Sequence, residues 1–246
     1  MNVIIFSKDR AAQLDLLLRS MPDFDEVYVI WTASDNKFAA GYDMLDFRGA
    51  MSVRQSQDFK DDVVWYADSP NEYTMFLTDD DVFLRDFVMP VIPDNVACLS
   101  LRLNPRMDYC YTLNRKQAPP KMQPGNIWNW RLADADYGYP MSLDGHIFRT
   151  ADILPLLEKL DYHDPNSLEA ALARNPINRP LMMCFDKSVI VNNPINRVQD
   201  TIKNRHGNVS AEWLNEQFLA GRRIKLEPFI GIEPKSCHVE LPIVME

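Results

Sequence analysis

The residues best suited to chemistry in this chain are three consecutive aspartates, Asp79, Asp80 and Asp81, which lie between the apolar runs 75–77 and 82–84. Two like charges at about 4 Å repel by about 1 kcal/mol even in water, and by more near a protein interior. This repulsion must be offset, either by water around an exposed acidic turn or by a bound cation.

The position of the triplet favours the cation. The run 73–77 has the composition of a buried strand, and ligands of open α/β sheets bind outside the carboxyl ends of the strands. Residues two apart in an extended segment point the same way, so we expect Asp79 and Asp81 to converge while Asp80 turns aside. Two carboxylates suit Mg²⁺ or Mn²⁺, which proteins usually hold through one or two carboxylates together with phosphates and waters.

The first thirty residues predict the start of the sheet that must position the triplet. Residues 3–6 form a short apolar run typical of a buried strand, and 27–31 form another. Between them, residues 11–21 carry apolar side chains at i, i+3, i+4 and i+7 from Leu14, which is one face of a helix, with Asp9 as the expected N-cap. The three segments predict a right-handed βαβ unit.

The rest of the chain continues this alternation. We expect strands at 73–77, 96–101 and 141–149, with one or two more in 179–194; the expected helices are 56–70, one from Thr150, one from Ser167, and 210–221, stopped by Gly221. The segment 56–70 could also hold a strand, but its apolar spacing favours a helix. Residues 102–139 have weak periodicity, which is typical of a functional or mobile loop. The pattern predicts an α/β protein of one domain, 1–246, with a mainly parallel central sheet flanked by helices.

Composition narrows the classes of partner. The net charge of −9 and pI of about 5.0 argue against broad nucleic-acid binding, which needs a basic surface. No run reaches the ~20 apolar residues that cross a bilayer, so we expect no transmembrane segment and a cytoplasmic location. The four cysteines form no C-x-x-C pair and are expected to be buried free thiols.

At this point the motifs resemble a known family. A strand ending in D-x-D, downstream of an N-terminal βαβ unit, resembles the GT-A fold of nucleotide-sugar-dependent glycosyltransferases. The opening VIIFSKDRAAQLDLLLRSM is similar to the first strand, loop and helix of family 2-like members. The segment YPMSLDGHIFR, followed by LEAALAR, resembles their second half, although Leu168-Glu169-Ala170 stands where many relatives have a Glu-Asp pair.

The resemblance covers about residues 1–205. It implies a Rossmann-like half that binds the nucleotide sugar in 1–101, an acceptor half in 102–205, and a C-terminal helix and tail in 206–246. The implied activity is metal-dependent transfer of a sugar from a nucleoside-diphosphate sugar to an acceptor hydroxyl, with inversion. Asp81 is expected to coordinate Mn²⁺ or Mg²⁺, and Asp79 to share the ion or to touch the ribose. The residues expected to contact the nucleotide sugar are Ser7, Asp9, Arg10, Asp79, Asp80 and His146.

Inverting transfer needs a carboxylate that takes the proton of the acceptor hydroxyl. Glu169 is expected to be this base and Asp144 a ligand of the donor or acceptor sugar, with the two roles exchangeable. Each has a structural alternative, because a glutamate in the first turn of a helix is favoured by the helix dipole and Asp-Gly is a strong turn dipeptide. His146 has the alternative of a core histidine.

Several further residues are candidates for the site. Those that could serve the same site are His206 and His238 as a further metal ligand, Trp128 and Trp130 as sugar-stacking rings or core anchors, Arg197 on a phosphate, and Thr32, Ser34 and Asp35 on the nucleoside or in an ordinary βα loop. The acceptor is expected to be a carbohydrate, or a lipid-linked molecule met at the membrane surface. The alternative functions are a nucleotidyltransferase, another metal-dependent phosphate-group enzyme, and an inactive nucleotide-sugar-binding module.

Overall fold

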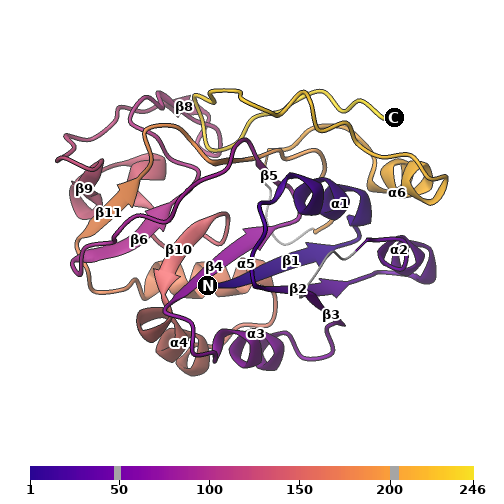
Figure 1. Ribbon diagram of the computed structural model, residues 1–246, viewed down its shortest axis with the longest axis horizontal. Coiled ribbons are helices and arrows are strands. Elements are labelled where there is room, and N and C mark those ends of the chain that lie inside the picture. Colours follow the sequence, from indigo (N-terminus) through magenta and orange to yellow (C-terminus); the bar gives the residue numbers. More distant parts are fainter. Residues whose placement is uncertain (47–50, 200–204) are drawn as a thin grey trace.

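The computed structural model describes residues 1–46, 51–199 and 205–246 and has helices on both sides of a large mixed sheet (Figure 1). Within these residues the main sheet has eight strands in the order β3-β2-β1-β4-β10-β6-β11-β9. Its strands are β1 (Asn2–Lys8), β2 (Glu26–Thr32), β3 (Met51–Gln55), β4 (Tyr73–Thr78), β6 (Val96–Ser100), β9 (Ile127–Asn129), β10 (His146–Arg149) and β11 (Leu181–Cys184). Two short pairs lie outside it, β5 (Asp81–Phe83) with β12 (Ile190–Asn192) and β7 (Tyr109–Cys110) with β8 (Arg115–Lys116). The helices are α1 (Ala11–Ser20), α2 (Asn36–Tyr42), α3 (Phe59–Ala67), α4 (Thr150–Lys159), α5 (Pro165–Arg174) and α6 (Ala211–Leu219), with 3₁₀ turns η1 (Trp130–Leu132) and η2 (Ala135–Gly138).

The first four strands of the sheet determine where a ligand can bind. β3, β2, β1 and β4 are all parallel, and the chain leaves β1 toward β2 on one side while β4 lies on the other. The order 3-2-1-4 is that of a doubly wound fold, in which the strand order reverses between β1 and β4. The predicted α/β class and mostly parallel sheet are therefore confirmed.

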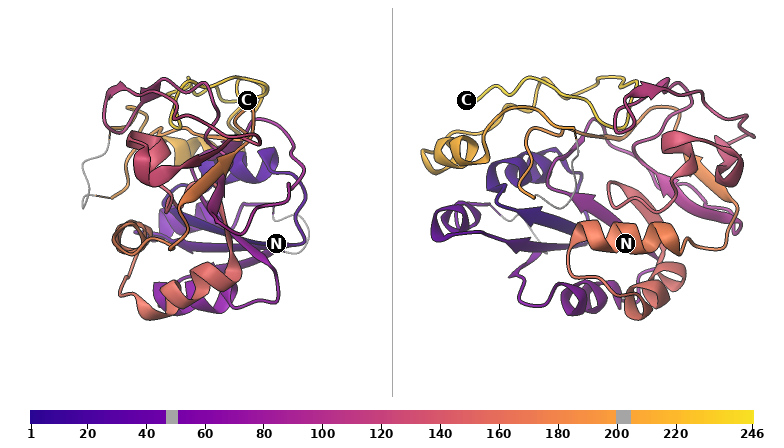
Figure 2. Two further views of the ribbon diagram at one scale, coloured as in Figure 1. Left: turned by 90° about the vertical axis from the view of Figure 1, so that its left-hand side faces the viewer. Right: turned by 180° about the vertical axis from the view of Figure 1, so that it is seen from behind.

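Apolar runs are long in these strands because both faces of the sheet are covered. Along β1, Val3 and Ile5 belong to the core beneath α1 and α6, while Ile4 and Phe6 belong to the core beneath α3, α4 and α5. Figures 1 and 2 show α3 and α4 together on one side of the sheet, with the C-terminal tail on the opposite side.

Strand β10 differs from the expectation. The sequence predicts a strand over 141–149, but β10 begins only at His146 and is antiparallel to both β4 and β6. Gly145 has φ +65°, a left-handed conformation that ends the extended segment, so residues 141–145 form an irregular approach to the strand.

One expected helix cap is wrong. The N-cap of α1 is Arg10, not Asp9. Asp9 has φ +57°, and its carboxylate accepts hydrogen bonds from the N–H and the hydroxyl of Ser34, in the loop after β2. A tertiary partner therefore binds the side chain that local propensity would use as a cap. Helix α4 begins at Thr150, as expected, and the Thr150 hydroxyl shares a hydrogen bond with Thr74.

Other boundaries follow local signals. Helix α5 begins at Pro165, earlier than expected, because Asp164 caps it and forms a capping box with Ser167. Ser210 caps α6 as expected, and Gly221 follows the helix with φ +85°. Helix α2 and strand β3 are not predicted from the sequence. Asp35 is the N-cap of α2, in the loop after β2, and this is the alternative in which the residue belongs to an ordinary βα loop.

The segment expected to be irregular, 102–139, contains only β7, β8, β9 and the two 3₁₀ turns as regular structure among its residues. Trp128 is buried and donates to the carbonyl of Tyr137, so it anchors this segment in the core. The four cysteines are free and buried, as predicted. In the part of the chain that the structure describes, no helix is long and apolar enough to cross a membrane.

Candidate functional site

A cavity of about 800 Å³ lies at the carboxyl ends of β1 and β4. Its lining includes Ser7 and Lys8 from β1, Thr78 from β4, and residues of the segments 192–199, 205–206 and 238. The volume is within the range of small-molecule sites. The cavity occupies the crevice at the reversal of strand order, where open α/β sheets bind ligands.

The acidic triplet stands at the end of β4, as expected, and its side chains are largely shielded from solvent. Because β4 ends at Thr78 and residues 79–80 form a turn, strict alternation does not continue through the triplet. The arrangement differs from the expected one: Asp79 and Asp80 line the cavity, whereas Asp81 is fully buried behind them.

Asp79 is held by groups of the protein itself. Its Oδ1 accepts from Arg10 at 2.9 Å, and its Oδ2 accepts from the hydroxyl of Ser7 at 2.8 Å and from the backbone N–H of Lys8 at 3.1 Å. Burial raises the pKa of Asp79 to about 6, although the Arg10 charge opposes the shift. The predicted residues Ser7 and Arg10 therefore position Asp79.

Asp80 and Asp144 meet at one hydroxyl. Thr78 Oγ1 lies 2.8 Å from Asp80 Oδ1 and 2.9 Å from Asp144 Oδ1. A threonine hydroxyl has one proton and can donate to only one of them, so the second carboxylate oxygen lies against a lone pair. Asn192 also donates to Asp80 Oδ1, at 3.0 Å. This crowding of anionic oxygens is the kind of arrangement that a cation or a proton relieves.

Asp81 adds a third carboxylate behind the first two. Its Oδ2 accepts from the backbone N–H of Thr78 at 3.0 Å, and its exposed fraction is 0%. Burial raises the pKa of Asp81 well above its usual range, and the charges of Asp144 and Asp80 raise it further. Three carboxyl groups, two from the triplet and one from the loop before β10, therefore crowd together at the end of β4.

Asp144 reaches the cavity because of the turn that follows it. The N–H of Gly145 donates to the carbonyl of Phe76 at 2.8 Å, which holds the turn against β4. Arg102 donates to Asp144 Oδ2 at 2.8 Å and to the hydroxyl of Ser142 at 2.6 Å. Burial alone would raise the pKa of Asp144, but the Arg102 charge, followed by His238, lowers it below its usual value.

Glu169 faces the same cavity from α5. Since α5 begins at Pro165, this glutamate lies beyond the first turn and owes its place less to the helix dipole. Its Oε1 accepts from the backbone N–H of Leu143 at 3.2 Å. Burial, and then the charge of Asp144, raise the pKa of Glu169 to about 7, with Arg102 opposing. A half-buried carboxyl that titrates near neutral pH can exchange a proton with a bound molecule.

Two predicted contact residues do not line the cavity. Asp9 is engaged by Ser34. His146 is buried, with Nδ1 3.1 Å from the carbonyl of Pro140, which can only accept, so Nδ1 carries the proton. Burial, and then the Arg102 charge, lower the pKa of His146 to about 3. Its surroundings are those of the core-histidine alternative.

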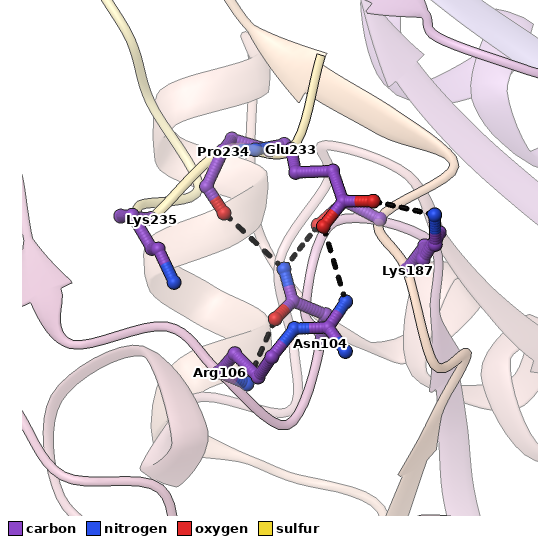
Figure 3. A pocket seen from close by; sticks show the side chains of 7 residues that line it. Asn104, Arg106, Lys187, Glu233, Pro234 and Lys235 are labelled. Atoms are coloured by element: carbon purple, nitrogen blue, oxygen red, sulfur yellow. Dashed lines mark hydrogen bonds and ion pairs between the residues drawn. The ribbon is translucent and has the colours of Figure 1, made fainter. Parts of the chain in front are cut away.

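His238 reaches the cavity on the C-terminal tail. Its Nε2 lies 3.8 Å from Asp144 Oδ2, and its ring stacks on that of Tyr111. The tail is fixed just upstream, where Glu233 pairs with Lys187 and Arg106, and Asn104 donates to the carbonyl of Pro234 (Figure 3). The small cavity among these residues, about 10 Å³, has room for no more than about one water.

The remaining candidates divide into two groups. Arg197 and His206 line the cavity, as does Thr32. Trp128 and Trp130 do not: Trp130 donates from Nε1 to the carbonyl of Arg179 at 2.7 Å, which makes it an anchor like Trp128.

Several residues of the site were missed. Thr78, Arg102 and Asn192 each contact one or more of the acidic residues. The sequence does carry a weak signal for Thr78 and Arg102, because each lies at or directly after the end of a predicted strand. No group of three His, Cys, Asp or Glu side chains gathers closely enough to hold a metal ion among residues 1–46, 51–199 and 205–246.

Comparisons of this chain with models of protein families and with curated proteins find no match.

Proposed function

We propose that this protein is a metal-dependent glycosyltransferase of the GT-A type, which moves a sugar from a nucleoside-diphosphate sugar to an acceptor hydroxyl with inversion. The observation that carries the proposal is the meeting of Asp80, Asp144 and Glu169 on one cavity at the reversal of strand order. That position suits a nucleotide, and the three carboxyl groups supply an ion site and a base beside it.

The donor set fits a hard divalent ion. Asp80 and Asp144 crowd one hydroxyl, Asp81 lies behind them, and Mg²⁺ and Mn²⁺ are commonly held by one or two carboxylates with substrate phosphates completing the shell. Asp80 and Asp144, which line the cavity, would hold the ion, whereas Asp81 is buried behind them and Asp79 is tied to Arg10, Ser7 and Lys8. When bound, the ion would neutralise charge that develops on the departing diphosphate.

The chain's own residues would orient the donor. The nucleoside would lie toward β2, where Phe6, Ile30 and Phe59 form an apolar wall, and Lys8 would face the phosphates. Arg10 bridges Asp79, Asp80 and Asn196, and so ties the floor of the cavity to the segment that covers it. This network would fix the diphosphate beside Asp80 before reaction.

Glu169 would act as the base. The acceptor oxygen forms a bond to the anomeric carbon while the bond from that carbon to the diphosphate breaks. The diphosphate leaves with the electron pair, and the carboxylate of Glu169 takes the proton of the acceptor hydroxyl. A base with a pKa near the working pH is efficient in this role.

A thermal-shift screen tests the proposal. UDP-, GDP-, CMP- and dTDP-sugars are added with and without Mn²⁺, and one nucleotide is expected to raise the melting temperature in a Mn²⁺-dependent way, because a ligand that binds only the folded state stabilises it. Asp80→Asn and Asp144→Asn should each remove most of the Mn²⁺-dependent shift. Asp86→Asn, an exposed carboxylate on the same stretch of chain, is the matched control and should keep it.

Two outcomes contradict the proposal. One is a screen in which no nucleotide sugar shifts the melting temperature. The other is a shift that is equal with Mn²⁺ and with EDTA and unchanged in both aspartate variants. Binding without hydrolysis or transfer would instead favour the nucleotide-sugar-binding module without catalysis.

A further inference from the structure

The end of the cavity farthest from β2 differs in chemistry from the rest. Strands β2 and β10 lie on opposite sides of β4 in the sheet, so Asp144, which precedes β10, and the proposed nucleoside end lie on different sides of β4. The wall at this end is built by the β7–β8 turn, by η2 and by α5, which contribute Leu113, Asp136, Tyr139 and Glu169.

Two apolar side chains of this wall are open. Tyr139 is 38% exposed and Leu113 is 52% exposed, and both line the cavity. Tyr139 makes no side-chain hydrogen bond within the described residues. Two neighbouring tyrosines do have partners: the hydroxyl of Tyr111 donates to Glu240, and that of the buried Tyr137 donates to the carbonyl of Asn104. An aromatic ring left open inside a cavity is a surface that a ligand can cover.

The backbone under this ring is fixed. The N–H of Tyr139 donates to the carbonyl of Asp136 at 3.4 Å, which closes η2. At Gly138 an added Cβ would lie 2.8 Å from the carbonyl oxygen of Ala133, so the turn has room only for glycine. The carbonyl of Pro140, the next residue, accepts from His146. Tyr139 is therefore presented on a rigid turn beside Glu169, whose charge contributes, after burial, to a raised pKa of the phenol.

The polar groups at this end are hydrogen-bond acceptors. Asp136 accepts from Gln117 at 2.9 Å, and Glu169 accepts from the backbone N–H of Leu143; each carboxylate retains further lone pairs. Two nearby arginines already form ion pairs with carboxylates of the protein: Arg102 pairs with Asp144, and Arg205 pairs with Glu240 and stacks on Tyr111. An anionic group would meet carboxylates here, whereas hydroxyl groups would meet acceptors.

We propose that Tyr139, Leu113, Asp136 and Glu169 form an acceptor subsite for an uncharged sugar. The inference rests on the proposed function and names its acceptor class. The C–H face of a pyranose, which carries partial positive charge, covers the negative face of the Tyr139 ring. Its hydroxyl groups donate to Asp136 and Glu169, and the hydroxyl on Glu169 is the one that reacts. The subsite excludes acceptors that carry a phosphate at this position.

The test uses saturation-transfer difference NMR on the full chain with Mg²⁺, which is diamagnetic, and with UDP or GDP present. The neutral probes are the methyl glycosides of glucose, galactose, mannose and N-acetylglucosamine, and the anionic probe is glucose 6-phosphate. At least one neutral glycoside is expected to receive saturation, strongest on the protons of one ring face, while glucose 6-phosphate receives none. Tyr139→Ala should weaken binding by about three- to tenfold, the range measured for aromatic contacts, whereas Tyr139→Phe, which keeps the ring, should retain it.

Leu132→Ala is the matched control, because Leu132 is 85% exposed in the neighbouring turn η1 and lies outside the cavity wall. The inference is overturned if glucose 6-phosphate is saturated and the neutral glycosides are not, if no glycoside is saturated, or if Tyr139→Ala binds as the unmodified protein does. The thermal shift by nucleotides separates failure of this inference from failure of the proposed function. If nucleotides bind with Mn²⁺ but no glycoside binds, the transferase proposal is unaffected. Glycoside binding without any nucleotide binding supports a sugar-binding site at Tyr139 but refutes the transferase proposal, and with it the acceptor role of that site.

Discussion

The turn that brings Asp144 into the cavity depends on Gly145 for two separable reasons. Its φ of +65° lies in the left-handed region, and an added Cβ would overlap Cδ1 of Ile190 and lie 3.0 Å from Cγ1. Ile190 is fully buried in β12, so its side chain has little room to move. Gly145→Ala therefore carries a backbone cost and a packing cost.

The two costs can be separated by a matched glycine. Gly221 has φ +85° and nothing within 4 Å of an added Cβ, so Gly221→Ala carries the backbone cost alone, about 1–2 kcal/mol. Overpacking of a buried site costs about 1–3 kcal/mol more. We therefore expect Gly145→Ala to lower the free energy of unfolding by about 2–5 kcal/mol, and Gly221→Ala by about 1–2 kcal/mol.

Urea denaturation measures both, with the slope m expected to stay constant. Ile190→Val removes the overlapping Cδ1 and alone should cost about 0.5–1.5 kcal/mol. In the double variant, the smaller valine side chain makes room for the alanine, so the two changes together should cost less than their sum by about 1 kcal/mol or more. Equal losses for Gly145→Ala and Gly221→Ala, or strict additivity with Ile190→Val, would refute the packing argument.

Two further predictions concern α5. Because the pKa of Glu169 is raised to about 7, burial of this group favours its protonated form; the stability it contributes is present below about pH 4.5 and is lost as the pH rises through 7, by on the order of 3 kcal/mol. Glu169→Gln, which cannot ionise, should reduce the pH dependence of the unfolding free energy, measured by urea denaturation between pH 5 and pH 8. A pH dependence equal to that of the unmodified protein would contradict the assigned burial. Asp164→Ala removes the side chain that accepts from the N–H of Ser167 and should lower the free energy of unfolding by about 1 kcal/mol. Asp161 is an exposed aspartate just before the helix, so Asp161→Ala should lower it by less than about 0.5 kcal/mol. Chemical denaturation of the two variants side by side checks this, and equal losses of unfolding free energy would contradict the capping role.

The sequence predicted the elements whose signals are local. Continuous apolar runs gave β1, β2 and β4, and the spacing of leucines gave α1, because burial on both faces or along one stripe leaves its pattern within a few residues. The same pattern placed the acidic triplet at the end of β4. The capped start of α6 at Ser210 is equally local.

The expectations that failed depend on partners far away in the chain. Asp9 has the sequence context of a helix cap, but Ser34 takes its carboxylate. The strand expected from residue 141 starts only after Gly145, whose turn is fixed by Phe76 on β4. Helix α2 is seven residues long, too short for its periodicity to be recognised.

The sequence by itself therefore determined which residues carry charge and at which strand end the aspartates lie. Only the tertiary structure decided which group each carboxylate meets: Thr78 and Asp144 are 66 residues apart in the chain, and Arg10 and Asn196 are 186 residues apart. The physical reason is that charge and hydrophobic periodicity are properties of a short segment, whereas hydrogen-bond partners and pKa shifts arise from burial and from neighbours that the sheet order brings together.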